Sequence, residues 1–472
     1  MEVGSPQVES TAAPYLPSVG TRQMGVWAAT AVVTGEAISL GIFLTPAGMA
    51  KSLGSPALLA AVWCGMALIT LAGALSFTEL AVRNPHDGGE YLYLRRGFGQ
   101  HAAFLYGWMA AIVMYPGVAA ALSVGIVPYL QALIPIPAKM GSFVPALILL
   151  SLGALNYFGT RLSSRLMTTL NWLKVPVLAA LVGWALLSGH AIMSNLLPLA
   201  SRRPGSEPLV DGIAGATISA FFCFGGWWEA GKIAGEVRNP SRNLAVAFFG
   251  GVLIVTAIYL LLSLAFVAVV PVQQIQSNAA FVALFGQALF GEAGARVLAT
   301  CVVLCVLGGL MVLTMAVPRV TFALAQNECA GTNRGALAAF ARMHPRFGTP
   351  ANGILLQTAM ALLVLTLGAF DRILAYIIFP SVIFLALTAA TLFRAVTPVK
   401  RWWYPVAPIL FIAGSGVLAL MLLLHNPGAA LLGAAIVLCG LPVRWFLRRR
   451  SRAEFQPTTE SSNENQAAIP NS

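Results

Sequence analysis

The chain has 472 residues, of which 58% are hydrophobic and only 9% are charged, and its formal net charge is +12. Soluble domains usually carry about 25% charged residues, so this composition excludes an ordinary soluble protein. The excess of positive charge does not indicate nucleic-acid binding, because the Lys and Arg residues lie in short loops between apolar segments. The composition instead predicts an all-α polytopic membrane protein in which one helical bundle takes up nearly the whole chain.

Twelve membrane spans are predicted within a single transmembrane domain, residues 23–449. The flanking residues, 1–22 and 450–472, are polar and are predicted to be disordered cytoplasmic tails. The first twenty residues contain no Lys or Arg and no apolar core, so they are not expected to be a signal peptide. The predicted spans are 24–50, 56–82, 99–131, 141–158, 168–188, 212–236, 243–270, 293–325, 351–370, 372–394, 402–424 and 428–447.

The positive residues give the bundle an orientation. If the N-terminus is cytoplasmic, six of the 28 Lys and Arg residues lie outside and 22 lie inside. The opposite orientation would invert this ratio, against the positive-inside rule. The six outer residues are Lys51, Lys139, Arg202, Arg203, Arg296 and Arg372. We therefore predict a multi-pass protein of the plasma or inner membrane with both termini cytoplasmic.

Glycine-rich interruptions occur in the first and the sixth span. The first reads TGEAISLGIF from Thr34, and the sixth reads FFCFGGWWE from Phe221. Each glycine weakens a helix by about 1 kcal/mol, and unwound backbone survives in a membrane only inside protein or beside a cavity. Spans that are five apart run in opposite directions, which favours a five-plus-five inverted repeat with broken helices one and six. The alternative is that these are ordinary packing glycines.

Charged residues deep inside a span cost about 2.5–3.5 kcal/mol each, which makes them functional candidates. Glu36 lies about one turn before the first break and is expected to serve a cationic group or a proton, or to pair with Lys232. Glu229, Lys232 and Glu236 share one helix face by their spacing, which favours a neutralised ion cluster. At the inner end of span two, the spacing of Glu79 and Arg83 predicts a helix-end pair or a gate contact.

The chain shows no local motif for a cofactor or a metal. It has no Walker loop, no dinucleotide fingerprint and no zinc-ligand spacing, and no Ser/His/Asp set is detectable. The six cysteines lie in or beside apolar helices, so we expect no structural disulfide. No cofactor, no metal, no nucleic acid and no enzymatic activity are expected, and ATP-driven transport is disfavoured.

Four stretches together resemble the amino acid–polyamine–organocation (APC) superfamily, and the closest branch is similar to the L-type amino acid exchangers. Each stretch alone would be a weak signal, but the four follow one another at similar spacing from span one to span nine. They are GEAISLGIFLTPAGMAKSLGSP from Gly35, TELAVRNPHDGGEYLYLRRGFG around Glu79, FCFGGWWEAGKIAGEVRNPSRN from Phe222, and the stretch from Arg319 to the Phe-Gly-Thr-Pro sequence that ends at Pro350.

The resemblance implies ten core helices, two peripheral helices and a central amino acid site at the breaks. Free N–H groups of a half-helix suit a carboxylate, and free C=O groups suit an ammonium. The carboxylate is expected near Ser39, Leu40, Gly41 and Ile42, and the ammonium near carbonyls of Ala37, Ile38, Phe222, Cys223 and Phe224, beside Gly225. The first span of this family usually carries the motif Gly-Ser-Gly. The corresponding residues here are Ser39-Leu40-Gly41, so the first glycine and the serine are absent from their usual places.

Further roles are implied by the resemblance. Phe222 is expected to gate the site and Trp227 to form a pocket wall, with core packing or lipid contact as the alternative for both rings. Lys174, early in span five, is expected to stand where related folds hold a sodium ion, which implies sodium-independent transport. The alternative for Lys174 is a side chain that reaches the cytoplasmic edge of the bilayer.

The sequence thus predicts a secondary active amino acid permease or exchanger that works by alternating access and binds a small amino acid or amine within the lipid bilayer. A polyamine or other organic-cation carrier is the alternative, supported by Glu36 and Glu229. A non-transporting membrane sensor is less favoured, because both tails are short. No cysteine falls in a predicted outer loop, so no disulfide-linked accessory subunit is expected.

Overall fold

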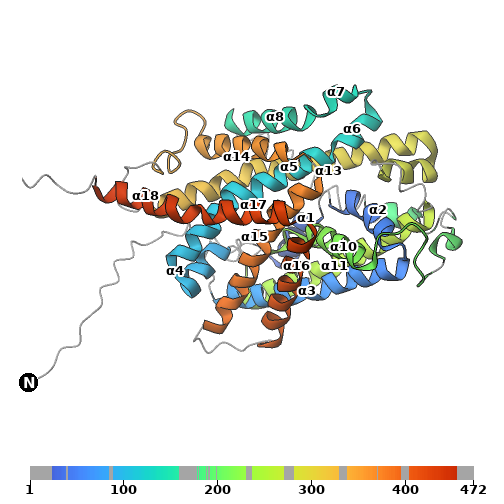
Figure 1. Ribbon diagram of the computed structural model, residues 1–472, viewed down its shortest axis with the longest axis horizontal. Coiled ribbons are helices and arrows are strands. Elements are labelled where there is room, and N and C mark those ends of the chain that lie inside the picture. Colours follow the sequence, from blue (N-terminus) through green and yellow to red (C-terminus); the bar gives the residue numbers. More distant parts are fainter. Residues whose placement is uncertain are drawn as a thin grey trace, which may run out of the picture.

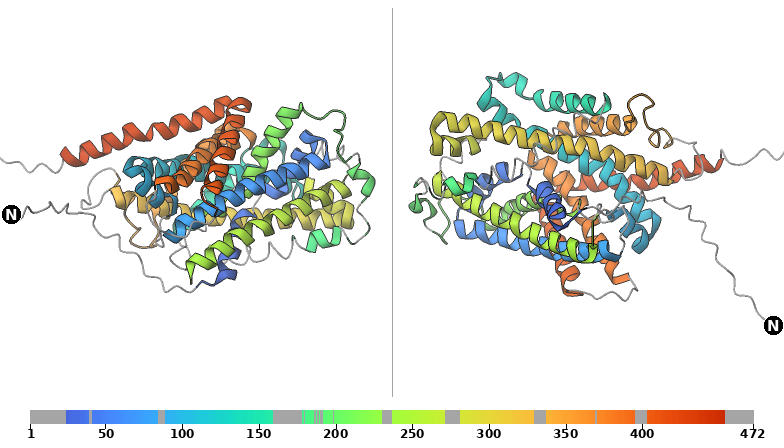
Figure 2. Two further views of the ribbon diagram at one scale, coloured as in Figure 1. Left: turned by 90° about the horizontal axis from the view of Figure 1, so that it is seen from below. Right: turned by 180° about the vertical axis from the view of Figure 1, so that it is seen from behind.

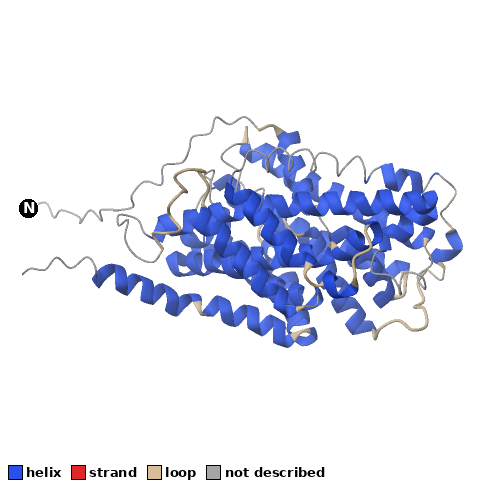
Figure 3. Cartoon of the chain, turned by 90° about the horizontal axis from the view of Figure 1, so that it is seen from above, coloured by secondary structure: helices blue, strands red, loops and turns tan. Residues whose placement is uncertain are grey.

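The computed structural model describes residues 24–38, 41–83, 89–158, 199–229, 237–270, 281–328, 337–368, 370–394 and 403–453, together with parts of 178–197. Within these ranges the chain is helical and forms no strand beyond one isolated bridge between Met24 and Val237. Figure 3 shows the helices as one bundle joined by short loops. The prediction of an all-helical protein is therefore confirmed for the part of the chain that is described.

The helices follow the order expected for the predicted spans. Their bounds are α1 (Val26–Ala37), α2 (Gly41–Leu53), α3 (Pro56–Arg83), α4 (Gly89–Met109), the π-helix η1 (Ala110–Met114), α5 (Tyr115–Gly125), α6 (Val127–Leu133), α7 (Ala138–Gly141), α8 (Val144–Phe158), η2 (Met193–Leu196), α10 (Leu209–Phe224), α11 (Pro240–Val269), α13 (Phe281–Glu328), α14 (Ala351–Val364), η4 (Leu365–Leu367), α15 (Phe370–Ala390), η5 (Thr391–Arg394), α16 (Val406–His425), α17 (Pro427–Leu438) and α18 (Gly440–Ala453).

Eight helical segments of the described chain are long and apolar enough to cross a membrane. These segments are Pro56–Arg83, Gly89–Leu133, Leu209–Glu229, Pro240–Val269, Val282–Met311, Arg372–Arg394, Val406–His425 and Pro427–Phe446. Two shorter apolar helices, Val144–Phe158 and Ala351–Leu367, stand where the sequence predicts spans four and nine. The first predicted span is present as the pair α1 and α2, and most of the fifth, 168–188, lies outside the described residues.

The helices pack in two groups. One group consists of α1, α2, α3, α10 and α11, in which α3 lies along α11 and α2 along α10. The second consists of α5, α6, α8, α13 and α14, which pack mainly against one another. Figures 1 and 2 show the first group in blue and green and the second in cyan and yellow to orange. Helix α15 contacts both groups, α16 packs on α3 and α10 of the first group, and α17 packs on α15. The two groups meet where α13 contacts α2 and α11.

Two helices begin earlier than the sequence predicts, because a glycine bends each of them. Gly99 in α4 has φ of 85° and Gly291 in α13 has φ of 69°. Both angles lie in the left-handed region, which side chains with a Cβ rarely adopt. The residues before each glycine therefore form a short helix at an angle to the span. The sequence analysis did not predict the short helix at 281–290.

A proline and a glycine bring α15 and α17 into close contact. Pro380 has no N–H, so it cannot donate a helical hydrogen bond to the carbonyl of Tyr376. Gly433 of α17 lies against that carbonyl, and a Cβ at this glycine would be 2.3 Å from the oxygen. Close approach of this kind depends on small residues at helix contacts inside membranes.

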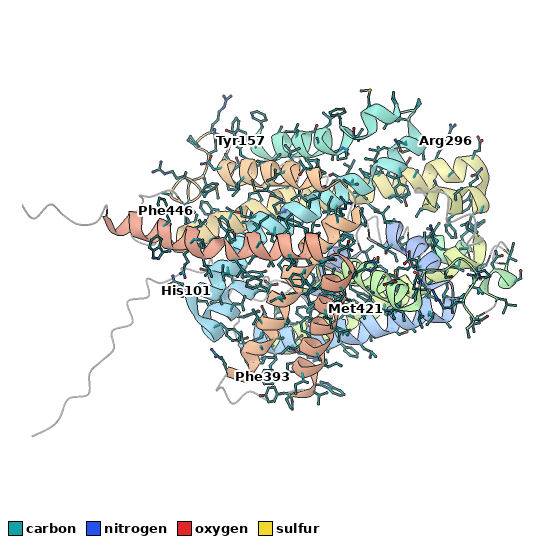
Figure 4. The ribbon with its side chains drawn as sticks, in the orientation of Figure 1. His101, Tyr157, Arg296, Phe393, Met421 and Phe446 are labelled. Carbon is teal, nitrogen blue, oxygen red and sulfur yellow. The ribbon has the colours of Figure 1, made fainter. Side chains whose placement is uncertain are left out.

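Large apolar side chains cover the outer surface of the bundle. Figure 4 shows many side chains that project away from the ribbon. The exposed large apolar residues include Leu147, Leu150, Phe249, Leu253, Leu410, Leu420 and Leu424. In water such a surface would mark an interaction or aggregation site. On a bundle of apolar helices of membrane-spanning length, it fits contact with lipid chains.

Candidate functional site

The first span is interrupted between Ala37 and Gly41. Helix α1 ends at Ala37, with the N–H of Ile38 donating to the carbonyl of Thr34 over 2.9 Å. Helix α2 begins at Gly41. Ser39 and Leu40, the other two residues of this predicted interruption, lie outside the described residues. The first N–H groups of α2 have no partner within their own helix, and the helix dipole makes this end positive.

The sixth span is interrupted after Phe224. Helix α10 ends there, and Gly225 and Gly226 form a turn before a short helical turn at Trp227–Glu229. Gly226 has φ of 97°, a conformation that requires glycine. The sequence analysis predicted an interruption at this Gly-Gly pair, and the structure has the helix end at the same position.

The two interruptions lie against each other. A Cβ at Gly41 would be 2.8 Å from the Sγ atom of Cys223 and 3.0 Å from its Cα atom, so only glycine fits. One helical turn after Gly41, the hydroxyl of Thr45 and the thiol of Cys223 are 2.9 Å apart and share a hydrogen bond. The same hydroxyl donates to the carbonyl of Gly41 over 2.9 Å. The start of α2 is thus fixed on the end of α10.

Tyr259 of α11 joins the two interruptions from a third helix. Its hydroxyl oxygen is 2.6 Å from the carbonyl oxygen of Ala37 and 2.9 Å from that of Cys223. A hydroxyl has one proton, so it cannot donate fully to both oxygens at once. Both carbonyls belong to the set that the sequence analysis assigned to an ammonium, and the structure brings them to the same atom.

Aromatic packing fixes the position of Tyr259. The ring is fully buried and its centroid lies 5.3 Å from the ring of Trp63 and 5.5 Å from that of Phe224. Trp63 itself meets Phe224 edge-on at 6.0 Å. Tilted and edge-to-face contacts at these separations are favourable for aromatic rings. The hydroxyl is therefore held in place by α3 and α10 as well as by its own helix.

The two aromatic residues predicted at the site have different surroundings. Phe222 meets Phe370, the first residue of α15, at 5.7 Å and nearly perpendicular. This contact joins the end of α10 to another span. Phe222 also lies next to the start of α2, because a Cβ at Gly41 would be 3.3 Å from its Cδ1 atom. Trp227 is 2% exposed and packs against Phe77, Phe248 and Phe411.

A charged residue follows the second break. The carboxylate of Glu229 accepts a hydrogen bond of 2.9 Å from the hydroxyl of Tyr115. Tyr115 stands directly after the π-helical turn η1 and before Pro116, which cannot donate to the turn that precedes it. Such turns often occur at functional sites. The hydrogen bond joins the two groups of helices, because Tyr115 begins α5 and Glu229 follows α10.

The other charged candidates are only partly described. Glu36 lies in α1, but its side chain is outside the described part of the chain, as are Lys174, Lys232 and Glu236 entirely. The pair predicted at the inner end of span two is present, because Arg83 donates to and forms a salt bridge with Glu79 one helical turn away. The prediction of that helix-end pair is confirmed.

A family model described as amino acid permease matches residues 24–441 of the chain. The match spans both interruptions and extends to the beginning of α18. The chain belongs to the amino acid permease family. This permease is therefore a multi-pass membrane protein and a transporter rather than an enzyme.

Relatives over nearly the full length support the assignment. The permease is 27% identical to the serine/threonine exchanger SteT of Bacillus subtilis (strain 168), over 91% of its own chain and 97% of the relative. It is 28% identical to the human large neutral amino acids transporter small subunit 2, over 93% and 83% of the two chains. It is 27% identical to the mouse Asc-type amino acid transporter 1, over 89% and 80%. The resemblance drawn from the four sequence stretches is confirmed.

The sequence analysis of this permease missed the residues that connect the breaks to the rest of the bundle. These are Tyr259, Thr45, Tyr115, Trp63 and Phe370. A hydroxyl inside an apolar span could have been recognised from the sequence as a candidate, because it needs a hydrogen-bond partner in the membrane. Which carbonyl or carboxylate serves as that partner depends on helices far apart in the sequence.

Proposed function

We propose that the permease is a secondary active transporter of amino acids, and that it works by alternating access with the substrate bound between α1, α2 and α10. The observation that carries this proposal is the meeting of two helix interruptions at Gly41 and Cys223. Such a meeting gives one small region both the positive start of a half-helix and the negative ends of two others. An amino acid zwitterion needs both kinds of group.

The proposed pose follows from these ends. The carboxylate accepts from N–H groups at the start of α2, at Gly41 and Ile42 and at the preceding Ser39 and Leu40. The ammonium donates to carbonyls of the two helix ends, including those of Ala37 and Cys223. Because the hydroxyl of Tyr259 brings one proton to two oxygens, an ammonium with three N–H groups supplies the missing donor.

The movement that we propose is a rocking of the two helix groups against each other. The groups share few contacts compared with the contacts inside each group, which suits relative motion. The Phe222–Phe370 ring pair is the proposed gate on the α2 side of the site. The same proposal includes twelve spans, a five-plus-five inverted repeat and two peripheral helices, with both termini in the cytoplasm.

Sodium independence is part of the proposal. It is supported by Lys174, which the family resemblance puts where related folds bind the ion, so that its ammonium substitutes for the metal's charge. Exchange of one amino acid for another then needs no ion gradient, and one of the relatives, SteT, is named a serine/threonine exchanger.

An organic-cation carrier is the second candidate. It is favoured by the carboxylate of Glu229, which lies directly after the second break and in reach of Tyr115. A carboxylate in a membrane interior is costly unless it serves a partner or a function. The variants Glu36→Gln and Glu229→Gln separate the candidates, because loss of cationic cargo with retained neutral cargo would favour the second.

Counterflow in proteoliposomes tests the proposal. Vesicles with purified permease are preloaded with one unlabelled amino acid, agmatine or putrescine, and the uptake of labelled compound is measured in choline and in sodium buffer. We expect accumulation of a neutral amino acid, equal in both buffers. Accumulation of cationic compounds alone would replace the first candidate by the second, and no accumulation of any compound would refute both. A requirement for sodium would refute the ion-independent mechanism.

A further inference from the structure

The last helix of the permease extends beyond the bundle. In Figures 1 and 2, α17 and α18 form an almost continuous rod in red, and the end of α18 projects past the neighbouring helices. Helix α18 contains five arginines and no acidic residue. The five are Arg444, Arg448, Arg449, Arg450 and Arg452. This density of positive charge exceeds what one helix end requires for its dipole.

Exposed apolar and aromatic side chains lie just before the arginine run. Trp445 is 55% exposed and Phe446 is 57% exposed, and Leu441 one turn earlier is also exposed. Position 449 follows 445 by one helical turn, and 450 follows 446 in the same way. Along two faces of the rod, an aromatic residue is therefore succeeded by an arginine. Aromatic side chains favour the membrane interface, and arginines favour the headgroups beyond it.

The base of α18 is anchored on α4. The guanidinium of Arg444 is buried over the ring of Phe104, 5.2 Å from its centroid. The indole of Trp108 donates to the carbonyl of Ile436 in α17 over 2.9 Å. These contacts hold the rod against the span that follows Gly99. Figure 4 shows His101 and Phe446 at the same end of the molecule.

The neighbouring surface is also basic. Arg95 and Arg96 are exposed on the first part of α4. Arg394 lies over the ring of Phe98 at 4.7 Å and donates to the carbonyl of Gly97 over 3.0 Å. The acidic residue in the first turn of α4, Glu90, is 1% exposed and does not contribute a surface charge. The charge presented by α4, η5 and α18 at this end is therefore positive.

We propose that α18 and the first part of α4 form a docking surface for the headgroups of anionic phospholipids. Charge complementarity and the adjacent aromatic residues identify the occupant as a membrane lipid, because a soluble anion would use the arginines but not Trp445 and Phe446. A basic cluster next to a span attracts an anionic leaflet with about 1 kcal/mol for each Lys or Arg. The surface goes beyond cargo transport and does not depend on which amino acid is carried.

A lipid titration tests the proposal. The full-length permease is held in micelles of a neutral detergent with phosphatidylcholine, and its thermal unfolding is followed as phosphatidylglycerol replaces phosphatidylcholine. We expect a rise in the unfolding midpoint that saturates. The half-saturating phosphatidylglycerol fraction should be about thirty times higher in the variant R449Q/R450Q, because two arginines are removed. The matched control is R296Q/R372Q, which removes the same charge from two exposed arginines on other helices.

Each outcome decides the proposal. Selective weakening in R449Q/R450Q, with recovery in R449K/R450K, supports it. Equal titrations for R449Q/R450Q and the wild type would overturn it and leave the arginines as orientation signals only. Equal weakening in R296Q/R372Q would overturn it in favour of a general charge effect. Glycerol 3-phosphate carries the headgroup charge without acyl chains, and full stabilisation by this compound would overturn the proposal in favour of a soluble anion.

Discussion

The hydroxyl of Tyr259 is the atom through which three helices meet at the candidate site. The hydroxyl is within hydrogen-bond distance of the carbonyls of Ala37 and Cys223. The ring of Tyr259 packs on Trp63 and Phe224. The variant Tyr259→Phe keeps the ring and removes the hydroxyl, which leaves two carbonyls of the breaks without this donor. We expect a loss of about 1–3 kcal/mol in stability and a changed KM for amino acid in counterflow, because the ammonium uses the same oxygens.

The matched control for that variant is Tyr129→Phe. Tyr129 is equally buried, and its hydroxyl donates to the carbonyl of Phe43 in α2 over 2.7 Å. Thermal unfolding of both variants measures the loss of a buried hydroxyl, and counterflow measures the effect on substrate. If both variants changed KM by the same factor, the special role of Tyr259 at the breaks would be wrong.

Gly41 is the point of closest approach between α2 and α10. In the variant Gly41→Ala, the new Cβ would lie 2.8 Å from the Sγ of Cys223 and 3.0 Å from its Cα, so the two helices must separate. We expect a loss of about 1–3 kcal/mol from overpacking, together with reduced transport. Purified protein is compared with the wild type by thermal unfolding and by counterflow.

The control for Gly41→Ala lies in the same helix. A Cβ at Gly48 would meet nothing within 4 Å. The variant Gly48→Ala is expected to be neutral, or to be more stable by up to about 1 kcal/mol, because alanine restricts the unfolded chain more than glycine does. Similar losses in both variants would show that helix propensity, and not the contact with Cys223, decides the effect.

At the scale of helices, the bond between Tyr115 and Glu229 connects the two groups. Hydrogen bonds to a charged group contribute about 1.5–3 kcal/mol, so Tyr115→Phe is expected to destabilise the protein by this order. In Glu229→Gln the amide oxygen still accepts, so the loss should be smaller. The double variant should lose less than the sum of the single ones, with a coupling of about 0.5–3 kcal/mol measured by unfolding. Strict additivity would contradict the direct interaction.

The helix interruptions were predictable for a local reason. Gly225 and Gly226 follow each other at the end of α10, and Gly226 has a positive φ that other residues rarely adopt. The additional helix before Gly291 was not predicted, because a single glycine in an apolar run is equally consistent with a straight helix. The π-helical turn before Tyr115 was missed too, although Pro116 gives a local reason for it.

For the whole molecule, the proposed orientation gives a direct expectation. With six of 28 positive residues outside, the proposed orientation puts the C-terminus in the cytoplasm. A green fluorescent protein fused after Ser472 should therefore fluoresce, and an alkaline phosphatase fused there should be inactive in intact cells. A phosphatase fused in the loop at Arg203 should instead be active. Activity of the C-terminal phosphatase fusion would reverse the orientation.

The sequence by itself determined the class of the molecule and the location of its two interruptions. Apolar composition, the spacing of four family stretches and the glycines at 225 and 226 are local properties of the chain, and they are enough to identify an amino acid permease. The tertiary structure decided which groups meet at the interruptions. Tyr259, Thr45 and Phe370 come from positions far apart in the chain, and a polar or aromatic residue in an apolar span gains its role only from the partner that packing brings to it.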